Sequence, residues 1–392
     1  MCKAWKHFIK DYVWGTAGGR NSLNRRLVHR WRNTAGRLKM VGTLGQEKVV
    51  GLFSNDTHVF CGIDSRLEIG LLAVYSLETG AWIRDLDPNP SEEMPPGTVP
   101  IYPRVAGGKG LVAAFPMDGK VVTLWSSEGE MDQLYSLNIQ NHDTSLSIID
   151  IKVSDGRKVV IWASGESCSY DASRRVFLVA LQMSADGTWN QTILCDFLPA
   201  VPFHKLASDT NWVALVESDR GVSLWRWDGR EQKSIILLES LGTRLNCVAL
   251  KAPFIILGLH QRGEEASINV YKLESEDARL IKKIPISTMF GGLSNCNNCH
   301  FYGFIHAGRD GWTLHMFQQK DLLDEHVSPE ETWTRKFCFQ TSSPCIDFNT
   351  TSLVYLGHGS RGESGEREVQ LLKRDFWLGG TQSAVSLFSR KR

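Results

Sequence analysis

A degenerate repeat runs through most of the 392-residue chain, and it constrains the fold more than any other feature. Each copy is a short apolar strand that ends at a marked position, often aromatic, and is followed by a polar turn, as in LLAVYSLETG and GVSLWRWDGR. The marked residues are Tyr75, Trp125, Val179, Trp225, Tyr271, His315 and Leu372, spaced 50, 54, 46, 46, 44 and 57 residues apart. Self-similarity at a period of roughly 40 to 50 residues is typical of repeat architectures.

Two further apolar runs precede each marked strand, such as CVAL and FIILGL ahead of Tyr271. Short runs rich in Val, Ile, Leu and Trp, separated by turn residues, indicate strands, so each unit is expected to contain four of them. Four strands at this period predict one blade of a β-propeller. A single blade cannot bury both faces of its sheet, whereas blades packed around an axis can. We therefore predict an all-β fold, a seven-bladed β-propeller with degenerate repeats, over residues 37–378.

The repeats resemble those of the WD-repeat (WD40-like) propellers. The segments SLETGAW after Tyr75 and SSEGE after Trp125 are similar to the outer-strand turn of that family. Most units lack the Trp-Asp dipeptide, and no unit begins with a Gly-His pair. The His/Ser/Asp/Trp hydrogen-bond network that the resemblance implies is therefore mostly absent, and we expect a divergent propeller held together by apolar packing.

Residues 1–36 are of a different kind, with the periodicity of two short amphipathic helices. In CKAWKHFIKDYVW, the residues Trp5, Phe8 and Ile9 have the spacing of one helix face. A second helix would carry Leu23, Leu27 and Trp31 on one side, among Arg25, Arg26, Arg30 and Arg32. From the residues alone, these helices could simply pack against the sheet domain.

The same opening segment resembles the end of an F-box. Its closing helix is matched in order by Cys2, Lys3, Trp5, Phe8, Ile9, Asp11 and Trp14. The resemblance implies an adaptor-facing helix formed by Cys2, Trp5, Phe8, Ile9 and Trp14. The Leu-Pro start of an F-box and its first two helices, which carry most of the adaptor contact, are not in this chain. We therefore predict that residues 1–36 are a C-terminal remnant of an F-box with a linker helix, and that residues 379–392 are a tail.

A set of arginines is the strongest candidate for a binding site. In a propeller, the loops between the second and third strands of the blades gather on one face, together with the connections between blades. Those loops contain Arg66, Arg220, Arg262, Arg309 and Arg361, while Arg104 and Arg244 precede first strands, as does His204. Converging guanidinium groups suit a phosphorylated or acidic peptide. Acidic residues flank most of these arginines, so the set could equally be a solvated surface whose charges cancel.

Catalytic signatures are nearly absent from the sequence. It has no G-x-S-x-G, Walker A or H-E-x-x-H motif, and the glycine-rich AGGKGL at 106–111 is expected to be a turn. The segment CNNCH at 296–300 matches a haem-attachment pattern, or half of a zinc site completed by His306, but two reduced thiols at a blade are the simpler interpretation. We therefore expect no enzymatic activity, cofactor or metal. A propeller hydrolase would need catalytic side chains converging on the axis, and no such set is evident.

Two functions follow from these features. Resemblance to the proteins that join an F-box to WD repeats implies a non-catalytic substrate receptor of an SCF-type ubiquitin ligase, which binds a Skp-type adaptor and a cullin at one end and an acidic or phosphorylated target at the other. The alternative is a stand-alone propeller scaffold for protein–protein interaction. A net charge of +1 and the lack of an 18-residue apolar run argue against nucleic-acid and membrane partners. Nine scattered cysteines and the lack of a signal-peptide pattern favour a location in the cytoplasm, or in the nucleus as well.

Overall fold

The structure is a computed structural model in which the described strands run from Leu38 to Asp375. The described residues are 38–375 without 44–47, 65–71, 87–103, 109, 116–119, 140–145, 155–156, 166–174, 196–203, 218–220, 231, 236–242, 262–265, 275–277, 287–293, 298–300, 309–310, 331, 333, 340–345, 349–351 and 362–366. The helices predicted within residues 1–36 and the tail at 379–392 lie outside this part. The limits 37–378 predicted for the propeller therefore stay a prediction.

The described residues form seven four-stranded antiparallel sheets, numbered here in chain order. Sheet 1 holds β2 Lys48–Ser54, β3 His58–Asp64, β4 Leu72–Ser76 and β5 Trp82–Leu86. Sheet 2 holds β6 Arg104–Gly108, β7 Leu111–Phe115, β8 Val121–Ser126 and β9 Gln133–Asn138. Sheet 3 holds β10 Leu146–Ser154, β11 Lys158–Gly165, β12 Arg175–Met183 and β13 Trp189–Cys195. Sheet 4 holds β14 His204–Ser208, β15 Trp212–Glu217, β16 Gly221–Arg226 and β17 Gln232–Ile235.

The other three sheets complete the fold. Sheet 5 holds β18 Thr243–Lys251, β19 Phe254–Gln261, β20 Ala266–Leu273 and β21 Ala278–Ile286. Sheet 6 holds β22 Ser294–Asn297, β23 Phe301–Gly308, β24 Gly311–Gln318 and β25 Thr334–Phe339, with the short helix α3 Gln319–Leu323 after β24. Sheet 7 holds β26 Ile346–Phe348, β27 Ser352–Arg361 and β28 Arg367–Asp375, and its fourth strand is β1 Leu38–Thr43 from the other end of the chain. The all-β prediction is confirmed.

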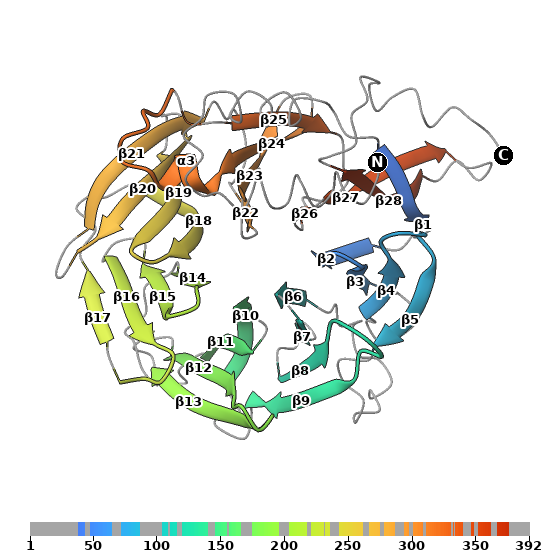
Figure 1. The fold of residues 1–392 in the computed structure, drawn as a ribbon, viewed down its shortest axis with the longest axis horizontal. Coiled ribbons are helices and arrows are strands. Elements are labelled where there is room, and N and C mark those ends of the chain that lie inside the picture. The colour runs from blue at the N-terminus through green and yellow to red at the C-terminus, as the bar shows by residue number, and fades with distance from the viewer. Residues whose placement is uncertain are drawn as a thin grey trace, which may run out of the picture.

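The sheets lie side by side around a common centre, with the first strand of each innermost and the fourth strand outermost (Figure 1). Contacts join the first strands of successive sheets from β2 round to β26, and β26 in turn contacts β2. Strand β1 pairs with β28 in antiparallel register, Leu38 opposite Arg374 and Thr43 opposite Gln370. The two ends of the described chain are thus hydrogen-bonded to each other within sheet 7.

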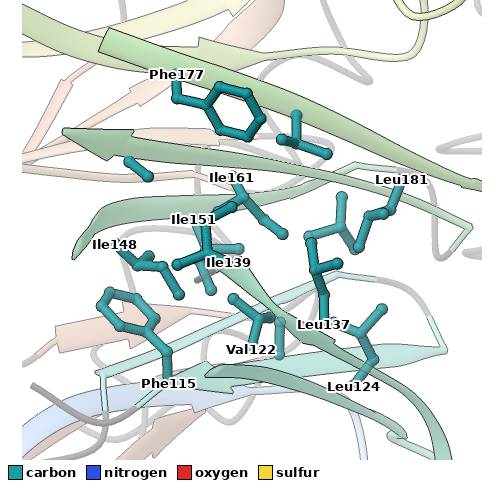
Figure 2. Packing of buried hydrophobic residues seen from close by; sticks show 14 of the residues in the cluster. Phe115, Val122, Leu124, Leu137, Ile139, Ile148, Ile151, Ile161, Phe177 and Leu181 are labelled. Atoms are coloured by element: carbon teal, nitrogen blue, oxygen red, sulfur yellow. The ribbon is translucent and has the colours of Figure 1, made fainter. Parts of the chain in front are cut away.

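The core consists of the interfaces between neighbouring sheets. In β7, alternate residues face opposite ways: Leu111, Ala113 and Phe115 pack against sheet 3, while Val112 and Ala114 pack against sheet 1. Figure 2 shows the interface between sheets 2 and 3, where Phe115 lies beside Ile148 in an apolar cluster that also contains Leu124 and Ile161. Because both faces of a sheet are buried, its strands are apolar at successive positions rather than at alternate ones.

The marked residues of the seven sequence repeats occupy equivalent positions in the seven sheets. All seven marked residues lie on the third strand of their sheet, counted outward from the centre of the ring, on β4, β8, β12, β16, β20, β24 and β28. In five sheets a β-bulge in the pairing with the fourth strand falls beside the marked residue. The extra residue in the fourth strand is always apolar: Val41, Ile83, Leu134, Leu194 and Ile281. The degenerate repeat therefore encodes a bulge that recurs near the outer edge of the ring.

The glycine-rich segment at 106–111, expected to be a turn, comprises the end of β6, the connection with Gly110 and the first residue of β7, and two of its glycines also have a packing role. Gly110 has φ +76° between β6 and β7, a conformation that favours glycine. A Cβ atom added to Gly107 would lie 2.2 Å from the Phe53 ring of sheet 1, and one added to Gly108 would lie 2.9 Å from Val153 of sheet 3. The absence of side chains at Gly107 and Gly108 thus lets β6 approach both neighbouring sheets.

Polar side chains link neighbouring sheets at the end of the ring where first and second strands are joined. Asn55, between β2 and β3, accepts from the backbone N–H of His58 and donates 2.8 Å to the carbonyl oxygen of Ser127 in sheet 2. The carboxylate of Asp347 in sheet 7 accepts from the N–H and the hydroxyl of Ser54 in sheet 1. These bonds add directional contacts to the apolar interfaces.

An insertion after β24, which the repeat pattern did not predict, packs against the outer edge of sheet 5. Leu322 of α3 is fully buried in the interface between sheets 5 and 6. Lys282 of β21 is buried beneath the insertion and donates to the backbone carbonyl oxygens of Asp321 and Asp324, at 2.7 and 3.1 Å. Burial lowers the pKa of the Lys282 ammonium group. No helix among the described residues has the length and apolar character needed to cross a bilayer.

Glu325 of this insertion makes its contact with sheet 5 dependent on pH. Hydrogen bonds from Lys272 and from Arg279, the latter at 2.6 Å, lower the pKa of Glu325 to about 2, from 4.5 in an unperturbed carboxyl. The stabilisation is therefore complete above about pH 4.5 and is lost as the pH falls toward 2. We expect urea unfolding midpoints of wild type and Glu325→Gln to differ most above pH 4.5 and to converge toward pH 2. Glu330→Gln, an exposed change in the same insertion, is the control, and a Glu325→Gln difference that persists at pH 2 would contradict the assignment.

Candidate peptide-binding face

The chain order places the predicted arginine positions at one end of the ring. Because the strands of each sheet alternate in direction, the loops between second and third strands lie at the same end as the connections between sheets. Arg66, Arg220, Arg262 and Arg309 fall between β3 and β4, β15 and β16, β19 and β20, and β23 and β24, outside the described residues. Arg361 is the last residue of β27, where its side chain is not described. That these five guanidinium groups converge stays a prediction.

Arg104 has a described side chain, and its contact is with the fold itself. It is the first residue of β6 and is exposed, and its Nη1 donates 2.8 Å to the carbonyl oxygen of Ile149 on β10. Ile149 is the extra residue of a β-bulge, since Ile148 pairs with Ala163 and Asp150 pairs with Trp162. A bulged residue leaves the ladder, so Arg104 supplies its carbonyl with a partner from the neighbouring sheet. This bond occupies one of five N–H donors on the guanidinium group, so a second role in binding is compatible with it.

Basic residues also begin the first strands of sheets 4 and 5. His204 is the first residue of β14, opposite Glu217, and Arg244 is the second residue of β18, opposite His260. Together with Arg104 they lie within the first two residues of three innermost strands at the same end of the ring; the His204 and Arg244 side chains are not described. Lys205, directly after His204, is exposed. On the first strands at this end of the ring, the described cationic side chains are Arg104 and Lys205.

The innermost strands also present features that the sequence reasoning missed. Bulges occur at equivalent positions of β2, β10 and β18, where Val50, Ile149 and Asn246 are the extra residues. The side chain of Ile149 is 37% exposed, an unusual state for isoleucine in a first strand. The consecutive Ile148 and Ile149 in LSIIDIKV break the alternation expected of a strand, and that break was the available signal.

Next to the bulge in β18 lies a buried thiol, Cys247, that is expected to be unreactive. Burial raises the pKa of the Cys247 thiol to about 12, so the group is protonated at neutral pH. A protonated thiol is a poor nucleophile and a poor metal ligand. Within the described strands and turns, no three His, Cys, Asp or Glu side chains are grouped so that they could hold a metal ion. In the CNNCH segment, Cys296 lies on β22 opposite Gly303, while Cys299 and His300 are outside the described part.

The five residues predicted to face an adaptor, Cys2, Trp5, Phe8, Ile9 and Trp14, all lie outside the described residues. Their role therefore stays a prediction.

No family model and no curated protein matches this sequence. Among solved structures, the chain is similar to U3-55K, with a TM-score of 0.53 and 12% identity over 86% of this chain and 98% of that one. It is similar to the β-propeller domain of Cps50 (Swd1) from Myceliophteria thermophila, with a TM-score of 0.50 and 10% identity over 86% of this chain and 98% of that one. The WD40 domain of SCAP from fission yeast has a TM-score of 0.50 and 10% identity over 90% of this chain and 89% of that one. At such low identity the likeness is one of fold alone: it supports the WD40-like propeller and gives no support to an F-box.

Proposed function

We propose that the chain is a non-catalytic protein-binding propeller that holds an acidic or phosphorylated segment of a target protein at the end of the ring where Arg104, His204 and Arg244 begin their strands. The observation that carries this proposal is the recurrence of basic residues at one end of the innermost strands of sheets 2, 4 and 5. The five loop arginines belong to the same end by chain order. Arginine forms paired, charge-assisted hydrogen bonds with carboxylates and phosphates, which suits it to this task.

We further infer that the seven sheets are the blades of one closed propeller. The unbroken series of contacts between first strands and the pairing of β1 with β28 both support closure. Closure would matter for binding because it fixes the first strands relative to one another, so that residues from several blades act on one ligand. Pre-organised donors lose less conformational entropy when a ligand binds.

The finer role that we propose is that of a substrate receptor in an SCF-type ubiquitin ligase, with residues 1–36 directed toward a Skp-type adaptor and cullin. The support for it is the sequence pattern of Cys2, Trp5, Phe8, Ile9 and Trp14. The alternative is a stand-alone protein-interaction scaffold, which the likeness to WD40 domains supports equally well. Co-purification of the full chain with a Skp-type adaptor and a cullin distinguishes them: recovery of both favours the receptor, and their absence favours the scaffold.

An array of acidic peptides, each printed with and without phosphoserine, tests the binding face. We expect the wild-type chain to retain a subset of peptides and Arg220→Ala/Arg262→Ala/Arg361→Ala to bind them at least about tenfold more weakly, since a hydrogen bond to a charged group contributes about 1.5 to 3 kcal/mol. Arg157→Ala removes an exposed arginine from the turn between β10 and β11, at the opposite end of the ring, and should leave binding unchanged. Equal binding by the triple variant and wild type would refute the proposed face. Arg104 is left intact because it bonds Ile149.

A further inference from the structure

The outer strands of the ring expose apolar side chains at a repeated register position. Opposite the marked residues Tyr75, Val179 and Tyr271 lie Trp82, Ile193 and Leu280, which are 58%, 49% and 38% exposed. Two of the bulge residues, Ile83 and Leu134, are also exposed, at 39% and 38%. Of these five side chains, four belong to sheets 1, 2 and 3. The indole N–H of Trp82 donates a hydrogen bond to the carboxylate of Asp85, at 3.0 Å. The rest of the exposed ring is therefore an apolar surface.

Two contacts link these three outer strands to one another. Arg84 of β5 donates 2.8 Å to the carbonyl oxygen of Glu130, in the turn that precedes β9. Tyr135 of β9 and Trp189 of β13 lie with their ring centroids 5.9 Å apart. The exposed large apolar residues on these strands, here called the rim surface, are Trp82, Ile83, Leu134 and Ile193. Several exposed large apolar side chains on adjoining outer strands favour a site that another segment covers.

One edge of the rim surface is acidic. The turns that lead into β5, β9 and β13 contain five exposed carboxylates and no lysine or arginine: Glu78, Glu128, Glu130, Asp132 and Asp186. The corresponding segment of sheet 4 contains Asp228, Arg230 and Glu231, and Arg230 lies 3.7 Å from Asp228. In sheet 5 the corresponding segment is also acidic, with Glu274, Glu276 and Asp277, and Glu274 lies 3.5 Å from Arg279 of the strand. The acidic edge and the exposed apolar residues together favour a basic, apolar occupant.

The chain itself contains such a segment. Residues 1–37 hold nine lysines and arginines against one aspartate, a net charge of +8, so the other 355 residues carry −7. The same segment is rich in large apolar residues, among them Trp5, Phe8, Trp14 and Trp31. Its charge is thus opposite to that of the edge, and its apolar residues match the exposed rim.

The point of attachment brings this segment to the right place. Residue 37 joins β1, which is the fourth strand of sheet 7, and sheet 7 contacts sheet 1 through β26 with β2 and through β1 with β4 (Figure 1). All fourth strands run in the same direction, so Leu38 lies at the end of the ring where the acidic turns precede β5, β9 and β13. Even as helix, at about 1.5 Å per residue, 37 residues extend about 55 Å. Tethering also gives the segment a high effective concentration at the neighbouring sheets.

We propose that residues 1–37 dock on the rim surface of sheets 1 to 3 within the same chain. Their aromatic and aliphatic side chains cover Trp82, Ile83, Leu134 and Ile193, and their basic side chains face the five carboxylates of the adjoining turns. The proposal depends on the rim and the charge pattern, and not on the role in a ubiquitin ligase. Because an adaptor would draw on some of the same apolar residues, the test is done without one.

Photo-crosslinking in the purified full chain tests the proposal. The crosslinker p-benzoylphenylalanine replaces Leu134 in one protein and Leu280 in another; both residues are 38% exposed on outer strands, but Leu280 lies on sheet 5. After irradiation and proteolysis, we expect position 134 to be joined to residues 1–37 of the same chain, with a yield that does not change on dilution. Position 280 should give little of this product. Glu128→Lys/Glu130→Lys/Asp132→Lys should lower the yield from position 134 several-fold, as should high salt.

The other outcomes overturn the proposal or its electrostatic part. Crosslinks from position 134 to a second copy of the chain, seen as a yield that falls on dilution, would make the rim surface a self-association site. No crosslink from position 134, or equal yields to residues 1–37 from positions 134 and 280, would exclude specific docking. A yield unaffected by the three charge reversals would remove the acidic edge from the explanation. Far-ultraviolet circular dichroism of each variant confirms that the sheets are intact.

Discussion

Replacing Asp209 with alanine is expected to lower the free energy of unfolding by about 3 kcal/mol, because several buried or partly buried N–H groups would lose their acceptor at once. Asp209 lies between β14 and β15 and is 8% exposed. Its Oδ1 accepts from the N–H groups of Asn211 and Trp212, both at 2.8 Å, and its Oδ2 accepts at 2.6 Å from Ala252 of sheet 5. One carboxylate thus closes a turn in sheet 4 and joins it to the next sheet.

Asp209→Asn separates these two tasks. The amide oxygen of asparagine can still accept from Asn211 and Trp212, but its nitrogen would face the N–H of Ala252 as a second donor. We expect this variant to lose about half as much stability as Asp209→Ala, mainly through the contact between sheets 4 and 5. Urea unfolding followed by tryptophan fluorescence measures both changes.

Asp186→Ala is the matched control. Asp186 forms a similar turn, accepting from the N–H and the hydroxyl of Thr188 at 3.0 and 2.7 Å, but it is exposed and makes no hydrogen bond to another sheet among the described residues. Its loss should cost less than about 1 kcal/mol, because water can replace it. If Asp186→Ala and Asp209→Ala destabilised the protein equally, the contact between sheets would contribute nothing measurable.

The fold was predictable from sequence because its repeat depends on the order of apolar strands and polar turns, which is kept even where particular residues differ. A strand with both faces buried must be apolar, and the third strand must end at a turn, so Tyr75, Trp125 and Trp225 keep their register although the Trp-Asp dipeptide is mostly gone. Trp225 is 1% exposed, yet its indole nitrogen has no hydrogen-bond partner among the described residues. Apolar packing therefore holds this position, as expected from the missing network.

Much of the candidate site was less accessible to sequence reasoning. The positions of Arg104 and Arg244 at the start of first strands followed from the repeat, but the bond from Arg104 to Ile149 depends on a bulge in another sheet. A contact between residues 45 positions apart leaves no periodic trace in the sequence. The insertion that carries Glu325 was missed for the same reason, since it interrupts one unit and packs against a different one.

Gly107→Ala is expected to cost about 2 kcal/mol, the second large effect, because the added methyl group has no room. A Cβ atom at this position would lie 2.2 Å from Cδ1 and Cε1 of Phe53. The Phe53 ring is stacked on Phe60, with centroids 5.8 Å apart, and belongs to the packed interface of sheets 1 and 2. The Phe53 ring cannot turn aside without disturbing that interface. We therefore expect the added methyl group to push β6 away from β2.

A double-mutant cycle with Phe53→Leu identifies the cause of this loss. Leucine removes the ring atoms that the new methyl group would meet, so the double variant should be more stable than the sum of the two single losses predicts, by about 1 kcal/mol. Gly129→Ala serves as the control: Gly129 has φ +65° and no atom within 4 Å of an added Cβ, so its cost of about 1 kcal/mol comes from the backbone alone. That cost should not change with Phe53→Leu. Additive losses for Gly107→Ala and Phe53→Leu would mean that close approach of the first two sheets is not what requires glycine at this position.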